Sequence, residues 1–412
     1  MLRLPLSCRA LANVCQEHNA AQKSKPREMR IRFNSTEARN NVPELDPSFV
    51  YVDTIFFTPK HVQTLWKKSV KVSTSDFAHG RRSDSGLVFG IRNLLDCDSN
   101  IGLHTATICV GNEDKVAWLR LNDATKKGNP GWDEKSTIDI SDHDKGGEEA
   151  FPESFQHASS MLDYLHRYKA IMKGGGKEAA QFYERCHRAR SPEELASIKS
   201  EMPPATAELL SKVDDARQYP VAMPNGGNNT GITSSSYSES FNNCIAEERQ
   251  LCMASAYKKL VVKERDRFIR SKEQAGACES IVPPRVAAAQ ASSRLAALRI
   301  DQSKITFLDS AKKVALVPGV TDSSRFFKVD LREVKNGGKN ACDGLCMVLK
   351  RDPCPHARAA AMAAGMDIHG LMNPLLTTAA WKDQYADLDF PLPSQADIDG
   401  YAHLINRNIR LP

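Results

Sequence analysis

The stretch GLVFGIRNLLDCDSNIGLHTATICV, Gly86 to Val110, contains two strand-like runs joined by a turn-rich segment. The outer runs are rich in aliphatic and β-branched residues, whereas DCDSN between them carries the Asp, Ser and Asn residues that favour turns. Two such runs separated by a short turn predict a β-hairpin. The sequence therefore places an antiparallel pair of strands ahead of the chain's midpoint.

Further strand-like runs lie on either side of this hairpin. Before it, FVYVDTIFFTP is β-rich and VKVSTSD alternates up to Asp76. After it, NEDKVAWLRL predicts a short helix, and STIDISD alternates up to Asp142. The predicted order is strand, strand, strand, helix, strand, with an aspartate at the end of the first and of the last strand. Because strand ends present side chains to a crevice at the sheet edge, Asp76 and Asp142 are candidates for one site.

The composition is that of a soluble globular protein. Of the 412 residues, 41% are hydrophobic and 26% are charged. No apolar run is long enough to cross a bilayer, so we expect no membrane contact. Eleven cysteines, an odd number spread over a long chain, favour reduced thiols in the cytosol or nucleus. The net charge of +6 permits contact with nucleic acid without requiring it.

Three carboxylates could form a catalytic set. Asp76 and Asp142 follow predicted strands, and Glu239 begins a predicted helix after a loop rich in Gly, Asn and Ser. Three converging carboxylates can hold two Mg²⁺ ions, which suit in-line phosphoryl transfer. The alternative is chance, because a chain with 50 acidic residues contains many well-spaced triples.

A cluster near the C-terminus predicts a metal site. The stretch CDGLCMVLKRDPCPHARAA contains Cys342, Cys346, Cys354 and His356, three thiols and one imidazole that suit tetrahedral Zn²⁺. A full set of four ligands leaves no open position, so the zinc would be structural. The alternative is a group of core cysteines. Cys346 is the least secure ligand, because three residues separate it from Cys342, whereas the expected spacing would put the second cysteine nearer Gly344.

These motifs together resemble a Mutator-like element (MULE) transposase of the group that ends in a SWIM-type zinc finger. The segment VKVSTSDFAH is similar to the family's first catalytic segment, and IDISDHDKGGEEAFP to its second. ICVGNEDKVAWLRL is similar to the family's NE…W helix. TSSSYSESFNNCI resembles the segment that carries the third acid, and ACDGLCMVLKRDPCPHARAA resembles the SWIM pattern. Past FP the family usually has Cys or Asp followed three residues later by His, and counting from Phe151 places that pair at Ser159 and Leu162.

The resemblance implies an α/β protein with a ribonuclease-H-like core, a helical insertion, a helical region and a small SWIM finger. It implies that Asp76, Asp142 and Glu239 bind Mg²⁺ or Mn²⁺ and cut and join transposon-end DNA in the nucleus, with an oligomer possible. Two other functions stay open. The chain could be a catalytically inactive DNA- or protein-binding regulator derived from a transposase, or a non-functional remnant of an element.

The composition and the resemblance together predict a domain order. It runs from a basic, disordered arm (1–45) to a core (46–260) whose helical insertion covers about 151–222, then a helical linker (261–325), the zinc finger (326–372) and a C-terminal tail (373–412).

Overall fold

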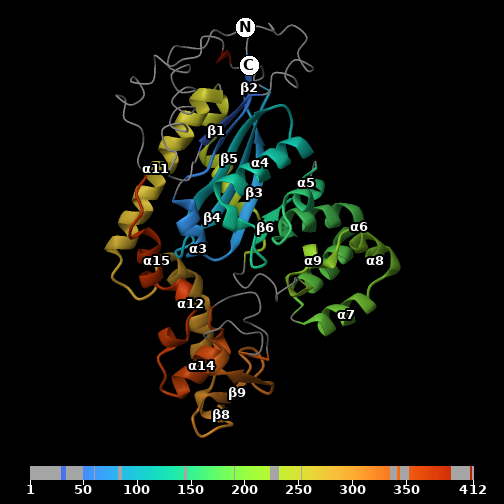
Figure 1. The fold of residues 1–412 in the computed structure, drawn as a ribbon. Coiled ribbons are helices and arrows are strands. Elements are labelled where there is room, and N and C mark those ends of the chain that lie inside the picture. Colours follow the sequence, from blue (N-terminus) through green and yellow to red (C-terminus); the bar gives the residue numbers. More distant parts are fainter. Residues whose placement is uncertain are drawn as a thin grey trace.

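The computed structural model (Figure 1) is a mixed α/β protein. It describes residues 29–33, 50–59, 61–81, 86–142, 146–189, 191–222, 232–251, 253–334, 341–343, 352–390 and 409–410. Its strands are β1 (Met29–Phe33), β2 (Val50–Phe57), β3 (Val72–His79), β4 (Leu87–Leu95), β5 (Ile101–Val110), β6 (Ile138–Ser141), β7 (Ser159–Leu162), β8 (Thr306–Phe307), β9 (Val314–Pro318), β10 (Phe326–Asp330) and β11 (Ile409–Arg410).

The helices are α3 (Val62–Lys67), α4 (Lys115–Gly128), α5 (Gly147–Ser154), α6 (Tyr164–His187), α7 (Pro192–Ser200), α8 (Pro204–Ser211), α9 (Asp215–Gln218), α10 (Ser236–Cys244), α11 (Met253–Ala277), α12 (Pro284–Leu298), α13 (Leu331–Val334), α14 (Pro355–Ala363) and α15 (Thr378–Tyr385). Short 3₁₀ turns are η1 (Pro130–Trp132), η2 (Pro220–Ala222), η4 (Glu248–Gln250), η5 (Gln302–Lys304), η6 (Ile368–Leu371) and η7 (Pro374–Leu376). None of the helices in the described ranges is long and apolar enough to cross a membrane.

One mixed sheet forms the centre of the larger part of the molecule. Its strand order is β1-β2-β5-β4-β3-β6-β7, and β11 pairs with β2. The predicted hairpin is confirmed, because β4 and β5 pair antiparallel from Leu87↔Val110 to Leu95↔Ile101. β3 pairs antiparallel with β4, whereas β6 lies parallel to β3 and β7 parallel to β6. The carboxyl ends of β3, β5 and β6 therefore meet at one edge of the sheet.

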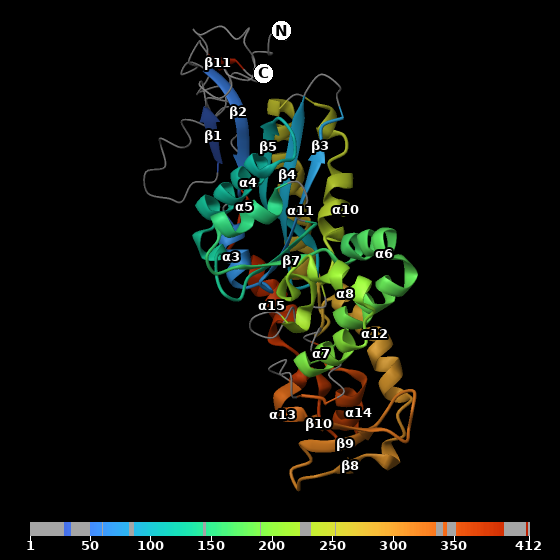
Figure 2. The same cartoon turned by 90° about the vertical axis from the view of Figure 1, so that its right-hand side faces the viewer.

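Helices cover both faces of this sheet, with α4 and α5 on one side and α10 and α11 on the other (Figure 2). Successive residues of β3 show the two faces, since Phe77 packs edge-on against Trp118 of α4 while Asp76 points to α10. Every residue of β4 is buried, as expected for a strand covered on both sides. On the α10 and α11 side the core includes Phe89, Ile91 and Leu260.

A buried ion pair crosses the sheet beneath α4. Arg92 of β4 and Asp139 of β6 lie 2.9 Å apart, and neither side chain has any exposed surface. The guanidinium also lies 4.5 Å from the centre of the Trp132 ring. Further hydrogen bonds join the pair to polar side chains of β3 and α4, namely Ser73, Ser75, Asn122 and Thr125. The charges are thus fully enclosed and fully hydrogen-bonded, which is how proteins tolerate buried ions.

The predicted helical insertion contains a strand. β7 lies inside the range 151–222 and pairs with β6, which makes it an edge of the main sheet. It is only four residues long and was hidden by the helical patterns around it. The helices α6 to α9 follow it and pack around the buried Tyr183 and Tyr219 (Figure 1). Gly176, with φ of 74°, interrupts α6 in a conformation that favours glycine.

A smaller module carries the C-terminal cluster. It combines the antiparallel sheet β10-β9-β8 with α12 and α14, which pack on a core of alanines and aliphatic residues. The segment predicted as a tail contains α15, which packs back against α11 and α3 of the larger part. Trp381 Nε1 and Tyr385 Oη donate to the buried carboxylate of Asp96 in the β4–β5 turn. Residues 378–385 are therefore part of a core, and the prediction of a tail was wrong for them.

Candidate functional site

Asp76 and Asp142 lie side by side at the sheet edge where β3 and β6 end. The parallel register pairs Thr74 with Ile140, so two residues further along each strand Asp76 stands beside Asp142 on the same face. β3 continues to His79, so Asp76 lies inside a strand, contrary to the predicted strand end. The pairing of His79 with Val88 of β4 extends the strand.

The environment of Asp76 disfavours its charge. Burial, followed by the negative charge of Asp142, raises the pKa of Asp76 to about 7, and the charge of Glu113 acts in the same direction. Hydrogen bonds from the Phe77 amide and from Asn242 partly oppose this effect. A cation placed between these carboxylates would relieve the repulsion, which is the usual state of affairs at a metal site.

Replacing Asp76 with asparagine should stabilise the metal-free protein at pH 8. A pKa raised from 3.8 to about 7 corresponds to as much as about 4 kcal/mol of destabilisation once the carboxyl ionises. Since this folded-state pKa is raised, the advantage of D76N should shrink as the pH falls through 7 towards 4. Urea unfolding at pH 8 and pH 5 with EDTA measures both values.

The exposed Asp123 of α4 provides the control for that experiment. Asp123→Asn, at a side chain that is 55% exposed, should change the unfolding midpoint little at either pH. Equal unfolding midpoints for wild type and D76N at pH 8 would show that the ionised Asp76 carboxylate does not destabilise the folded protein.

Helix α10 is fixed across β3 by polar contacts. Asn242 Nδ2 donates to Asp76 Oδ2 at 2.7 Å, and Ser238 Oγ donates to Thr74 Oγ1 at 2.8 Å. Asn93 Nδ2 of β4 reaches Ser238 Oγ at 3.1 Å. The segment that resembles the family's third acidic motif thus lies directly over the first aspartate.

Glu239 is on this helix but faces another partner. Its Oε1 lies 3.4 Å from His166 Nε2 at the start of α6, and its side chain is 48% exposed. Within the described residues, the group of three acidic, His or Cys ligand atoms that meets within 4.8 Å is the C-terminal cluster, not Asp76, Asp142 and Glu239. The structure therefore brings the two aspartates together and places Glu239 at the rim, bound to His166.

His166 belongs to a pair that the counting from Phe151 missed. Ser159 and Leu162 lie in β7, and the Asp and His three residues apart are Asp163 and His166. Asp163 is buried, caps α6 by accepting from the His166 amide, and lies 3.3 Å from His166 Nδ1. Burial alone would raise the pKa of Asp163, but hydrogen bonds from the His166 and Ser235 amides bring it below its usual value. The spacing itself was the available signal, four residues further along than the count.

Glu113 is a further acid at this edge. It follows β5, its side chain is buried, and its negative charge acts on Asp76. In the sequence it stood out as part of an NE…W motif and not as a site residue. A third carboxylate therefore lies near Asp76, and it comes from the segment between β5 and α4.

The C-terminal cluster is a compact, buried group that could bind a metal ion. Ligand atoms of Cys342, Cys354 and His356 all lie within 4.8 Å of one another, and Cys342 Sγ is 3.7 Å from His356 Nδ1. Cys342 is bridged to Val329 of β10, while Cys354 caps the α14 helix that carries His356. The fourth predicted ligand, Cys346, lies outside the described residues.

The loop that presents Cys354 is held from two helices. Arg358 of α14 donates from Nε to Pro353 O at 2.9 Å and pairs with Asp352 at 2.8 Å. Ser293 Oγ of α12 donates to Pro353 O at 3.1 Å. These contacts fix the turn that places the Cys354 thiol near the His356 imidazole.

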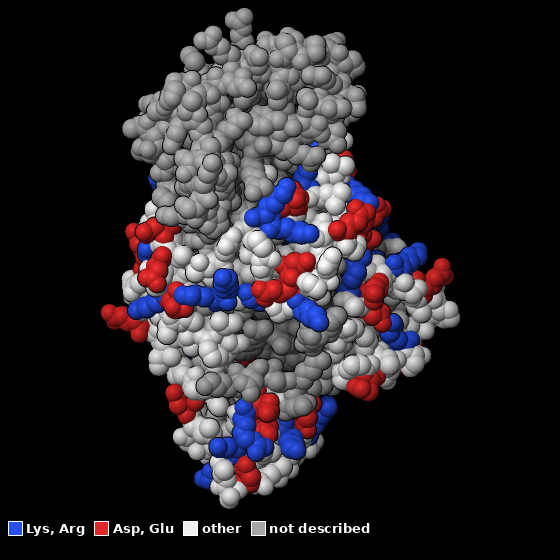
Figure 3. All heavy atoms as spheres, in the orientation of Figure 1, with Lys and Arg blue, Asp and Glu red and all other residues white. Residues whose placement is uncertain are grey.

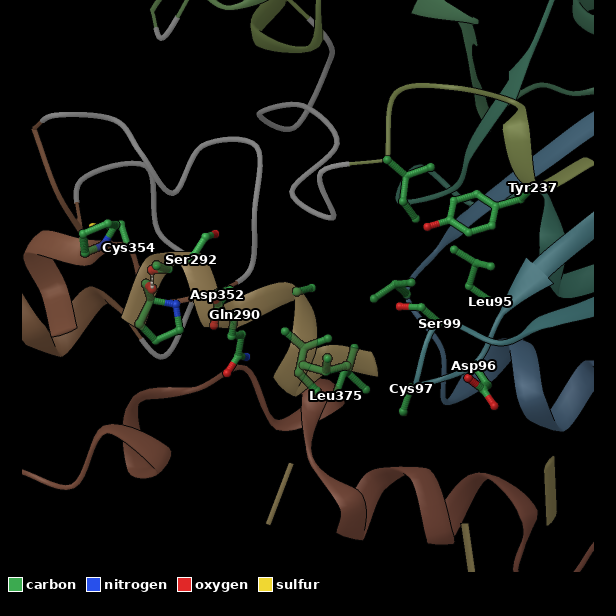
Figure 4. A pocket seen from close by; sticks show the side chains of 18 of the residues that line it. Leu95, Asp96, Cys97, Ser99, Tyr237, Gln290, Ser292, Asp352, Cys354 and Leu375 are labelled. Carbon is green, nitrogen blue, oxygen red and sulfur yellow. Dashed lines mark hydrogen bonds between the residues drawn. The ribbon is translucent and has the colours of Figure 1, made fainter. Parts of the chain in front are cut away.

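A cavity of about 650 Å³ separates this module from the opposite edge of the main sheet (Figure 4). Its walls come from the β4–β5 turn, α10, α12 and the loop before α14, with Tyr237, Gln290 and Asp352 among the polar groups. Gln290 is 4% exposed, and its Nε2 has no hydrogen-bond partner in the described structure. The cavity lies at the far end of the sheet from Asp76, so it is not part of the acidic site.

Surface charge does not mark a nucleic-acid site on the face seen in Figure 3. There, the described Lys and Arg side chains alternate with Asp and Glu.

No family model matches the chain, and no curated protein matches it. Function must therefore be argued from the acidic edge and from the Cys/His cluster.

Proposed function

We propose that the protein is a MULE-type transposase relative that cleaves and joins DNA at the edge formed by Asp76 and Asp142. The observation that carries the proposal is the parallel register of β3 and β6, which brings two half-buried aspartates side by side beneath α10. In this proposal the sheet is a ribonuclease-H-like core, and the protein acts in the nucleus on transposon-end DNA.

The strand order supports this proposal. Three antiparallel strands follow one another in the chain, a helix comes next, and the following strand lies parallel to the first. This is the order expected from the resemblance, with Asp76 in the first strand and Asp142 after the fourth. Asp163 and His166, three residues apart and close to Glu239, would correspond to the Asp and His that the family usually has past FP.

The acidic edge fits a divalent ion. Asp76 and Asp142 offer hard oxygen ligands. Burial and then the charge of Asp142 raise the pKa of Asp76, and Mg²⁺ or Mn²⁺ would relieve the repulsion between the two carboxylates. Such ions activate the attacking oxygen and stabilise the leaving oxygen of a phosphodiester. In this proposal Glu239 would become the third metal ligand once its contact with His166 is broken.

The C-terminal module would be the SWIM finger. Cys342, Cys354 and His356 provide soft sulfur and imidazole ligands, the chemistry that Zn²⁺ prefers, and Cys346 would be the fourth. A closed set of this kind makes the zinc structural. Its role would be to hold the small sheet and α14 together.

Nicking of supercoiled DNA by the purified protein tests the catalytic proposal. Wild type should nick with Mn²⁺ or Mg²⁺ and not with EDTA, whereas Asp142→Asn should lose at least about a hundredfold because a charged metal ligand is gone. Asp123→Asn, an exposed change on α4, should retain full activity. Equal nicking by wild type and D142N would mean that the activity belongs to a contaminant and that the proposal is wrong.

The contact between Glu239 and His166 favours a second candidate. If that contact is permanent, the chain would be a catalytically inactive DNA- or protein-binding regulator with a transposase fold. The His166→Ala variant distinguishes the enzyme from the regulator. In an enzyme, Glu239 without its His166 contact should leave metal-dependent nicking unchanged or increase it. No nicking by either protein supports the regulator.

A further inference from the structure

We infer that Arg81 and Arg249 form a phosphate clamp beside the acidic edge, a binding site for the phosphodiester backbone of a nucleic acid. The inference deepens the proposed function and rests on it for the choice of nucleic acid over other phosphate ligands. It names the chain's own groups that would contact the substrate next to Asp76.

One backbone hydrogen bond and one bond from the Arg249 side chain hold the two segments together. The Arg81 amide donates to Arg249 O at 2.8 Å, and Arg249 Nε donates to His79 O at 2.8 Å. Arg81 follows β3, the strand of Asp76, and Arg249 lies in η4, which follows α10. The two segments that frame the acidic edge thus lie against each other, and each carries one arginine.

The positive charges of Arg81 and Arg249 act on each other. Neither Arg81 nor Arg249 forms an ion pair with any described carboxylate, whereas the neighbouring Glu248 and Glu264 are already paired with Lys263 and Arg267. Burial, then the charge of Arg81, lowers the pKa of Arg249, and the charge of Asp76 opposes this. Two adjacent like charges are unfavourable, and an anion bound between them would remove that cost.

Phosphate is the anion that fits this geometry. A guanidinium binds phosphate oxygens with two parallel hydrogen bonds, and Arg249 keeps its two terminal nitrogens after Nε is used on His79. Because Arg249 Nε is hydrogen-bonded to His79 O, three residues beyond Asp76 on β3, a phosphate held here would lie next to the strand that carries Asp76. The clamp would hold the backbone while the acidic edge acts on an adjacent phosphodiester.

DNA binding by the full-length protein in the Asp142→Asn background tests the clamp without cleavage. Anisotropy of a labelled random-sequence duplex, measured over a salt series with EDTA, should show that Arg81→Ala weakens binding about tenfold at 0.1 M salt. The slope of log affinity against log salt should fall by about 1. Arg81 is exposed, so this variant should fold normally. Arg249→Gln should act similarly.

The control and the contrary outcomes are distinct from those of the nicking assay. Arg299→Ala, an exposed arginine that follows α12, should leave affinity and slope unchanged. Unchanged binding by Arg81→Ala, or no DNA binding by the parent protein, overturns the clamp even if nicking is seen. A labelled nucleotide that binds in an Arg81-dependent way while the duplex does not would also overturn it, in favour of a small phosphate ligand. If the purified wild-type protein does not nick DNA but Arg81→Ala still weakens DNA binding, only the catalytic proposal is wrong.

Discussion

Replacing Asp139 with alanine should destabilise the protein by about 3–5 kcal/mol, because it leaves the Arg92 guanidinium buried without its counter-ion. The expected effect is large since neither side chain touches solvent and the ring of Trp132 closes one side. Urea unfolding followed by tryptophan fluorescence measures the change, and Trp132 lies close enough to report on it.

A double replacement separates the cost of an unpaired charge from the value of the pair. Asp139→Ala combined with Arg92→Met should recover much of the lost stability, because no charge is then left buried. The exposed pair Lys127 and Asp123, on one helix turn of α4, gives the comparison, and Asp123→Ala should cost less than about 0.5 kcal/mol. If Asp139→Ala costs no more than that, the buried pair does not hold β4 to β6.

If zinc occupies the Cys342, Cys354 and His356 group as proposed, removing it should unfold the C-terminal module while the main sheet stays folded. Structural zinc in small finger domains contributes about 10–16 kcal/mol of apparent binding free energy, and seven of the fifteen buried residues in the module's core are alanines. Hydrogen exchange with and without a chelator should show loss of protection in β9 and β10 and retained protection in β4 and β5. Native mass spectrometry measures the metal directly.

Cysteine variants test which thiols bind the ion. Cys354→Ser should lose the zinc and, with cobalt in its place, the strong thiolate charge-transfer absorption. Cys278→Ser changes a partly exposed thiol far from the cluster and should keep both. Cys346→Ser decides the fourth ligand. A zinc-free wild-type protein with a protected β9 and β10 would show that the cluster is a set of core cysteines.

Strands with long alternating patterns could be predicted from the sequence, and isolated short ones could not. The hairpin of β4 and β5 was predictable because two apolar runs flank a turn of Asp, Ser and Asn. The four residues of β7 have no period of their own, and their strand structure depends on pairing with β6. Tertiary pairing, which no local pattern contains, decided that element.

The candidate sites likewise contain some features that the sequence predicts and others that depend on tertiary packing. The neighbourhood of Asp76 and Asp142 followed from two parallel strands ending at one edge, and the proximity of Cys342, Cys354 and His356 from their spacing. The contact between Glu239 and His166 joins two helices, so it depends on how the elements pack. The position of Arg81 beside Arg249 likewise depends on the path of the chain after α10.

The hydrogen bonds between Asp96 and α15 mean that the main sheet completes its folding only when α15 is present. The carboxylate accepts hydrogen bonds from Trp381 and Tyr385, which follow the residues of both candidate sites along the chain. Until they arrive, a buried acceptor lacks two of its donors, a state that costs free energy. A message with a premature stop before codon 378 should therefore yield a chain prone to aggregation and proteolysis, although both candidate sites would have been translated in full.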